Sequence, residues 1–191
     1  MAKLYFRYGS MSCGKTLDLL KTKFNYNERG KSVIIFTSKK DDRYGKNVVK
    51  SRIGIESDAI GVDDTFEILK YITNLTLKPD CILVDEVQFL TEKHIMELSD
   101  VVDSLDISVI CYGLKSDFKQ ELFPGSKSLL SICDVIENIP VICWCGKKAT
   151  VNARIIDNKI VYSGEQVLIG GNDCYLSLCR KHWKEGKIKK D

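Results

Sequence analysis

Short apolar runs alternate along this chain with segments whose apolar residues recur at helical spacing. The β-branched run 32–37 is typical of a buried parallel strand, and comparable runs occupy 4–8, 81–84 and 107–112, with a weaker one at 134–139. Helical spacing follows the polar residues near positions 16, 65 and 91. Strands that alternate with helices predict a parallel sheet with helices on both faces. We therefore expect an α/β fold.

Polar residues mark where two of the expected helices begin. Residues 63–65 precede a helix that would carry Phe66, Leu69 and Ile72 on one face, and Thr91 precedes a longer helix. Asp, Ser and Thr are favoured at these positions because their side chains accept hydrogen bonds from the first free backbone N–H groups.

Two stretches depart from this alternation. Residues 38–58 are polar without a lasting period, and a stretch of that length is usually a functional lid or disordered. After Pro140 the pattern becomes short, rich in glycine and cysteine, with a hairpin signal at 157–159. We therefore expect a nucleotide-binding α/β domain at 1–139 and a small second domain at 140–191.

The stretch after the first apolar run matches the phosphate-binding pattern G-x-x-x-x-G-K-[ST]. In such a loop, glycines let successive N–H groups point at a phosphate, and the helix that follows adds its positive end. Lys15 would reach the β- and γ-phosphates of a nucleoside triphosphate, and the Thr16 hydroxyl would ligate Mg²⁺. The residues expected around the phosphates are Gly9, Ser10, Met11, Ser12, Cys13, Gly14, Lys15 and Thr16.

Two adjacent carboxylates follow the strand expected at 81–84. Asp85 would hold Mg²⁺ directly or through water, and Glu86 would be free to act as a general base. The proton acceptor could serve water, in an NTPase, or a hydroxyl, in a kinase, and the pattern leaves both open. Arg43, in the charged segment 41–44, could contact the transferring phosphoryl group, although such segments are more often solvated surface.

The chain contains eight cysteines. Two pairs near its end match the ligands of a closed tetrahedral zinc site, and the second pair has the usual spacing whereas the first is tighter. Cys174 is a possible substitute ligand, and reduced buried thiols are the alternative. Cys81, Cys111 and Cys133 lie in apolar runs and are expected in the core, while His94 has no paired ligand and is expected at the surface. The expected zinc ligands are Cys143, Cys145, Cys179 and His182.

Composition adds little to this interpretation. Of 191 residues, 44% are hydrophobic, which is ordinary for a globular protein. The formal net charge of +3 is small and does not indicate binding to nucleic acid or to an anionic membrane. No apolar run approaches the roughly eighteen residues of a membrane span, and no leader precedes the first strand. We expect a cytoplasmic protein.

Taken together, these motifs resemble the zinc-containing (type II) thymidine kinases, over nearly the whole chain from Lys3 to about His182. Any one motif is weak, but their order and spacing are specific. The motifs that carry the resemblance are Gly9 to Thr16, Asp41-x-Arg43-Tyr44, Asp85-Glu86-x-Gln88-Phe89, Gly113-Leu114 to Phe118 and Phe123, Ile169-Gly170-Gly171 to Tyr175, and Cys179-x-x-His182.

The resemblance implies transfer of the ATP γ-phosphoryl group to the 5′-hydroxyl of thymidine, and also of deoxyuridine, in nucleotide salvage. It implies that Glu86 is the base, assisted by Lys15 and Arg43, and that Asp41, Asp85 and Gln88 join the ATP and Mg²⁺ site. Phe118 would stack on thymine, and a loop from Val167 would close over the nucleoside. The thymidine-binding residues that it implies are Met11, Phe89, Leu114, Phe118, Phe123, Val167, Leu168, Ile169, Gly170, Gly171 and Tyr175.

The resemblance also implies a homotetramer inhibited by thymidine triphosphate. The chain departs from the common form at Cys143-x-Cys145, which is shorter than Cys-x-x-Cys, and at Asn152, where animal members have threonine. Two other functions remain as alternatives. One is an NTPase in which Glu86 activates water, and the other is a zinc-stabilised binding module with a vestigial nucleotide site.

Overall fold

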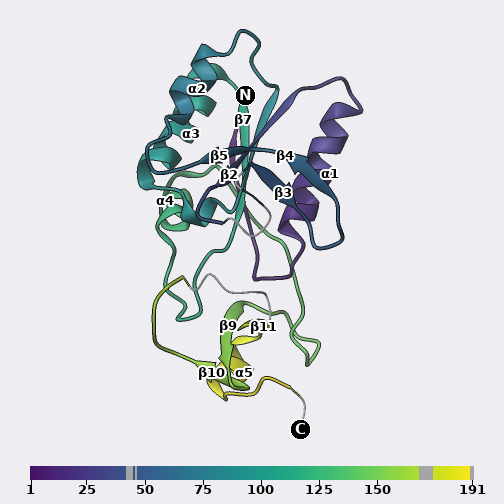
Figure 1. Ribbon diagram of the computed structural model, residues 1–191, viewed down its shortest axis with the longest axis vertical. Helices are drawn as coiled ribbons and strands as arrows, with labels where there is room; N and C mark the ends of the chain where they lie inside the picture. The colour runs from purple at the N-terminus through teal and green to yellow at the C-terminus, as the bar shows by residue number, and fades with distance from the viewer. Residues whose placement is uncertain (42–44, 46, 168–173, 190–191) are drawn as a thin grey trace.

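The computed structural model describes residues 1–41, 45, 47–167 and 174–189. A six-stranded parallel sheet in the order β5-β2-β6-β7-β1-β8 forms the larger part, and an antiparallel sheet in the order β10-β9-β11 forms a smaller part at one end of it (Figure 1). The strands are β1 (Leu4–Tyr8), β2 (Val33–Ser38), β3 (Val48–Lys50), β4 (Glu56–Asp58), β5 (Ile60–Val62), β6 (Cys81–Asp85), β7 (Ser108–Gly113), β8 (Val135–Asn138), β9 (Val151–Ile156), β10 (Lys159–Val161) and β11 (Tyr175–Leu178). The helices are α1 (Lys15–Asn27), α2 (Ile68–Asn74), the 3-10 turn η1 (Val87–Phe89), α3 (Glu92–Leu105), α4 (Pro124–Ile132) and α5 (Arg180–Lys184).

Helices cover both faces of the large sheet, as the alternation of runs predicts. Helix α1 lies on one face, and α2, α3 and α4 lie on the other (Figure 1). Strand β6 is buried along its whole length, and its side chains alternate between the two cores. Ile82 and Val84 pack towards α2 and α3, whereas Cys81 and Leu83 pack towards α1. All five expected strands are present, with bounds within one residue of the predicted runs.

The helix predicted after residue 65 begins later than expected. Phe66 lies before α2, which begins at Ile68. Asp63 caps a turn instead of the helix, since its Oδ1 accepts from the Thr65 hydroxyl at 2.8 Å. The N-terminus of α2 is capped from another element: the carboxylate of Glu97, on α3, accepts from the Ile68 N–H at 2.6 Å. No local pattern could reveal this cap.

The prediction that α3 begins after Thr91 is confirmed, but the surface position predicted for His94 is wrong. His94 is 1% exposed. Its ring accepts from the Thr91 N–H at 3.3 Å, and Thr91 Oγ1 accepts from the His94 N–H, so the two residues form a capping box. The other ring nitrogen lies 2.9 Å from the Phe66 carbonyl oxygen.

The polar stretch 38–58 contains a short hairpin. Strands β3 and β4 pair antiparallel within it. Buried Val49 packs with residues of α1, and Lys23 of α1 donates to the Ser57 hydroxyl at 2.5 Å. The remaining part of the expected lid, which contains Arg43, lies outside the described residues.

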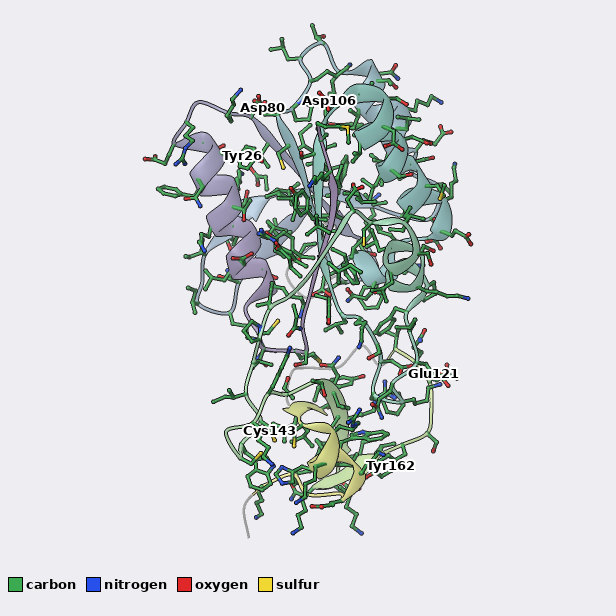
Figure 2. The ribbon with its side chains drawn as sticks, turned by 180° about the vertical axis from the view of Figure 1, so that it is seen from behind. Tyr26, Asp80, Asp106, Glu121, Cys143 and Tyr162 are labelled. Carbon is green, nitrogen blue, oxygen red and sulfur yellow. The ribbon has the colours of Figure 1, made fainter. Side chains whose placement is uncertain are left out.

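The chain leaves the large sheet after β8 and forms the small sheet from β9 onwards. The hairpin expected at 157–159 joins β9 to β10, with Asp157 and Asn158 at φ values of 49° and 57°. In Figure 2, Cys143 and Tyr162 lie in this small part, whereas Asp80 and Asp106 lie at the far end of the large sheet. Because Asp80 and Asp106 precede β6 and β7, the carboxyl ends of these strands point towards the small sheet. Within the described residues, no helix is long and apolar enough to cross a membrane.

Candidate active site

The phosphate loop joins the carboxyl end of β1 to the start of α1. A Cβ at Gly9 would lie 2.6 Å from the Ile139 carbonyl oxygen, so only glycine fits there. Gly14 and Ser12 both have positive φ, at 82° and 64°. The left-handed conformation is ordinary for glycine but strained for serine, and such strain persists where the surroundings hold it.

The side chains expected to meet the phosphates and a metal ion are close together. Lys15 is 7% exposed and curls back over the loop, with Nζ 3.3 Å from the Gly9 carbonyl and 3.2 Å from the Ser10 carbonyl. The Thr16 hydroxyl donates to Asp85 Oδ2 at 2.9 Å. A hydroxyl and a carboxylate at this separation are the oxygen ligands that a hard divalent cation prefers.

Asp85 is buried at the carboxyl end of β6. Burial raises the pKa of its carboxyl well above the ordinary value, and the neighbouring Glu86 carboxylate raises it further. The Thr16 hydroxyl and the Lys15 ammonium act in the opposite direction. A carboxylate that is costly to ionise in the empty protein is one that a bound cation would stabilise.

Glu86 occupies a strained backbone position, with φ at 51°. Gln88 donates from Nε2 to Glu86 Oε2, while its Oε1 accepts from the Leu114 N–H at 2.9 Å. Gln88 itself is 1% exposed. The Glu86 carboxylate is therefore oriented by a buried amide that is itself bonded to the end of β7.

A cavity of about 430 Å³ joins the phosphate loop to an apolar wall. Glu86 and Gln88 lie on its lining beside Lys15 and Thr16, and Asp41 lies there too. Seven of the residues expected to bind thymidine share this cavity, and they are Met11, Phe89, Leu114, Phe118, Phe123, Val167 and Tyr175. The other four, Leu168, Ile169, Gly170 and Gly171, lie outside the described residues.

The aromatic side chains that line the cavity, Phe89, Phe118, Phe123 and Tyr175, form what we call the aromatic wall, and they contact one another or Arg154. The rings of Phe89 and Phe123 meet edge to face at 5.8 Å. Phe118 is 1% exposed, and the guanidinium of Arg154 lies 3.7 Å from its ring centroid. Arg154 also donates to the Tyr175 hydroxyl at 2.6 Å. Sequence reasoning missed Arg154, because the residue alone gives no sign that it turns inward from β9.

Arg52 is a second residue that sequence reasoning missed. It lies between β3 and β4, and its Nη1 donates to the Ser12 hydroxyl at 2.7 Å. Arg52 and Lys50 both line the cavity beside the phosphate loop. The hairpin thus places positive charge beside the phosphate loop. The polar pattern of residues 38–58 did not predict this position.

The four expected zinc ligands are brought together in the small part, between the segment before β9 and the start of α5. Their ligand atoms all lie within 4.8 Å of one another, with Cys145 Sγ 4.0 Å from Cys179 Sγ and Cys143 Sγ 3.5 Å from His182 Nδ1. Tetrahedral Zn²⁺ with bonds of about 2.3 Å to sulfur places two thiolates roughly 3.8 Å apart, so the set fits. Cys174 is not part of this cluster.

Comparisons with known proteins show which family the chain resembles. A family model described as thymidine kinase matches residues 2–183. The thymidine kinase of Lactococcus lactis subsp. lactis is 49% identical over 189 residues, which cover 98% of this chain and 100% of that protein. The thymidine kinase of Streptococcus gordonii is 51% identical over 184 residues, covering 96% of each chain. That of Enterococcus faecalis is 49% identical over 184 residues, covering 96% of this chain and 95% of its own length.

Proposed function

The chain belongs to the thymidine kinase family, and from this premise we propose which of its residues carry out the transfer. The protein is an ATP-dependent kinase that phosphorylates thymidine for nucleotide salvage. The reaction requires ATP and a metal ion, which we propose is Mg²⁺. The acceptor is the 5′-hydroxyl of thymidine, and deoxyuridine is a second acceptor, since one methyl group in an apolar pocket changes binding by only about 1–3 kcal/mol.

We propose that Lys15, Thr16 and Asp85 hold the triphosphate and its metal ion. The backbone N–H groups of the phosphate loop and the N-terminus of α1 bind the phosphate oxygens. Thr16 and Asp85 are the proposed ligands of Mg²⁺. Their 2.9 Å contact supports this assignment, because it places both oxygen atoms close together. When bound there, the metal ion would supply positive charge beside the β- and γ-phosphates. Asp41 lines the same cavity and completes the polar side of the ATP site.

Glu86 is the proposed general base. Its carboxylate takes the proton of the 5′-hydroxyl as the oxygen attacks the γ-phosphorus. The Gln88 bond supports this role because it orients the Glu86 carboxylate at the lining of the cavity. Arg43, which lies outside the described residues, remains a proposed contact of the transferring group, as the resemblance implies.

Thymine is proposed to bind in the apolar part of the cavity, with its ring against Phe118. Met11, Leu114 and Phe123 form the surrounding wall, which suits the methyl group of the base. Phe89 supports Phe123 through their edge-to-face contact. Backbone contacts from 168–171 remain a proposal that rests on the resemblance alone.

Zinc is proposed to be structural. Cys143, Cys145, Cys179 and His182 supply four protein ligands, which leaves no open position for substrate. When bound, zinc would contribute folding free energy to a small sheet with a small core of its own. The division of the chain at residue 139 is also part of this proposal, and it rests on the change of pattern after Pro140. The homotetramer, inhibition by thymidine triphosphate and the cytoplasmic location are further parts, and they rest on the resemblance.

The observation that supports thymidine as acceptor most strongly is the single cavity that joins the phosphate loop, Glu86 and the aromatic wall. An NTPase needs only a water molecule at Glu86, so an aromatic surface for a second substrate would serve no purpose in its reaction. The test is ADP release from Mg-ATP by the purified full-length protein, with and without each deoxynucleoside. We expect release to depend on thymidine and to yield thymidine monophosphate. Release that is independent of any nucleoside would support the NTPase, and no turnover would support the vestigial site.

A further inference from the structure

Two side chains of the small sheet bond to the backbone of one residue of the phosphate loop, Met11. Asn152 Oδ1 accepts from the Met11 N–H at 2.7 Å, and the Ser177 hydroxyl donates to the Met11 carbonyl at 2.5 Å. Asn152 and Ser177 face each other on the paired strands β9 and β11. One cross-strand pair therefore satisfies both polar backbone groups of a residue that belongs to a different sheet.

The pair is itself held in place. Asn152 is 4% exposed, and its Nδ2 donates to the Ser116 carbonyl at 3.1 Å, so both ends of its amide are bonded. Turning the amide over would break both bonds at once. Ser116 lies two residues before Phe118 on the loop that carries the aromatic wall. Asn152 thus bonds to the phosphate loop through Met11 and to the loop that carries the aromatic wall through Ser116.

Met11 has a place in both halves of the cavity. Met11 lines the cavity, as do Leu114 and Phe118. Its backbone leads directly into Ser12, whose φ of 64° is strained for a residue with a Cβ. A strained loop keeps its shape only where neighbouring groups hold it. The Met11 bonds hold it from the small sheet, and the Arg52 bond to Ser12 holds it from the hairpin.

We propose that Asn152 and Ser177 are positioning residues that fix Met11 for both substrates at once. Asn152 lines the cavity, whereas Ser177 is not among its described lining residues, and both act here through Met11. Together they set the start of the phosphate-binding turn through the Met11 backbone and the shape of the apolar wall through the Met11 side chain. The part of this inference that concerns the wall rests on the proposed binding of thymidine beside Met11.

The test is a comparison of Ser177→Ala with Ser177→Thr in the full-length protein. Loss of one hydrogen bond of this kind is expected to raise the KM for ATP and the KM for thymidine together, each by about three- to tenfold. The kcat should stay within about twofold, because no group that reacts is removed. Ser177→Thr keeps the hydroxyl and should restore both values. Ser163→Ala, an exposed serine before β11, is the matched control and should leave both values unchanged.

Asn152→Ala is the second variant, since it removes the other bond to Met11 and should give the same joint rise. Zinc content and melting temperature are measured for every variant. Two unchanged KM values, a rise in only one of them, or a rise that appears only together with loss of zinc would each overturn the proposal. A wild-type protein without thymidine-dependent turnover would instead overturn the proposed function, and that measurement needs no variant.

Discussion

The Thr16 hydroxyl, at the start of α1, lies 2.9 Å from Asp85 Oδ2, at the end of β6. The two residues are 69 positions apart in the chain, and the parallel pairing of β1, β7 and β6 brings them together. This contact places a hydroxyl beside a carboxylate, the types of oxygen ligand that a divalent cation prefers. The same arrangement buries Asp85, and burial raises the pKa of its carboxyl.

Asp85→Asn should stabilise the ligand-free protein and abolish metal-dependent transfer. The folded-state pKa of Asp85 lies above its unfolded value, so the protonated form contributes stability that is lost as the pH rises through the folded pKa. Asparagine cannot ionise and avoids this loss. We expect the melting-temperature advantage of the variant, without metal or nucleotide, to be larger at pH 7.5 than at pH 5. The gain at the higher pH should be about 1–3 kcal/mol, the usual cost of an uncompensated buried polar group. An equal advantage at both pH values would contradict the assignment.

Glu86→Gln should lower phosphoryl transfer to thymidine by at least ~100-fold, the usual contribution of a general base. ATP binding should be retained, because the phosphate loop is untouched. Steady-state turnover and binding of a fluorescent ATP analogue measure the two quantities. Glu92→Gln, at an exposed carboxylate in the first turn of α3, is the control. Wild-type turnover in Glu86→Gln would remove Glu86 from the base role.

Arg52→Ala should raise the KM for ATP by about tenfold, in line with loss of a charge-assisted contact that is partly screened by solvent. The effect should shrink as ionic strength rises, because the charge is exposed. Arg29→Ala, at an exposed arginine beyond α1, should leave the KM for ATP unchanged. A KM for ATP that does not respond to Arg52→Ala would leave the hairpin arginine without a role at the triphosphate.

Phe118→Leu should lower kcat/KM for thymidine by about tenfold, since stacking of an aromatic ring on a base contributes about 1–3 kcal/mol. Leucine keeps the position apolar while it removes the ring. The KM for ATP should change little. Phe24→Leu, at a ring that is 60% exposed on α1, is the control. Equal losses for ATP and thymidine would indicate a general loss of structure rather than a missing stacking surface.

Cys145→Ser should lower the zinc content and reduce the melting temperature of the small part by about 10 °C or more, because metal binding contributes directly to folding. Cys174→Ser should keep the full zinc content, since Cys174 lies outside the cluster. Metal analysis and a thermal scan check both outcomes. Retained zinc in Cys145→Ser together with loss in Cys174→Ser would exchange the two assignments.

The sequence was sufficient for features that depend on neighbouring residues. The phosphate loop needs only a strand, two glycines and a helix in succession, and the five large-sheet runs needed only their apolar pattern. It was not sufficient where the partner lies far away in the chain. Glu97 caps α2 from α3, and the buried ring of His94 lies 2.9 Å from the Phe66 carbonyl oxygen. Neither contact leaves a local pattern.

The same limit applies to the site. Lys15, Thr16, Asp85 and Glu86 could be predicted because their motifs are contiguous. Arg154 could not, since its inward position depends on how β9 faces the aromatic wall. Residue type alone suggested a solvated charge, and only the packing of β9 and β11 on the loops of the large sheet reveals its environment.

The stacking of Trp144 on His182, with ring centroids 4.1 Å apart and planes 11° from parallel, provides an optical signal. The chain has two tryptophans, and the other, Trp183, contacts Tyr162 in the same small part. Tryptophan emission therefore reports the small sheet alone, while the large sheet contributes only tyrosine and phenylalanine. Excitation at the long-wavelength edge of tryptophan absorption, where tyrosine does not absorb, therefore follows unfolding of the small part in an unlabelled sample. Far-UV circular dichroism of the same sample reports the whole chain.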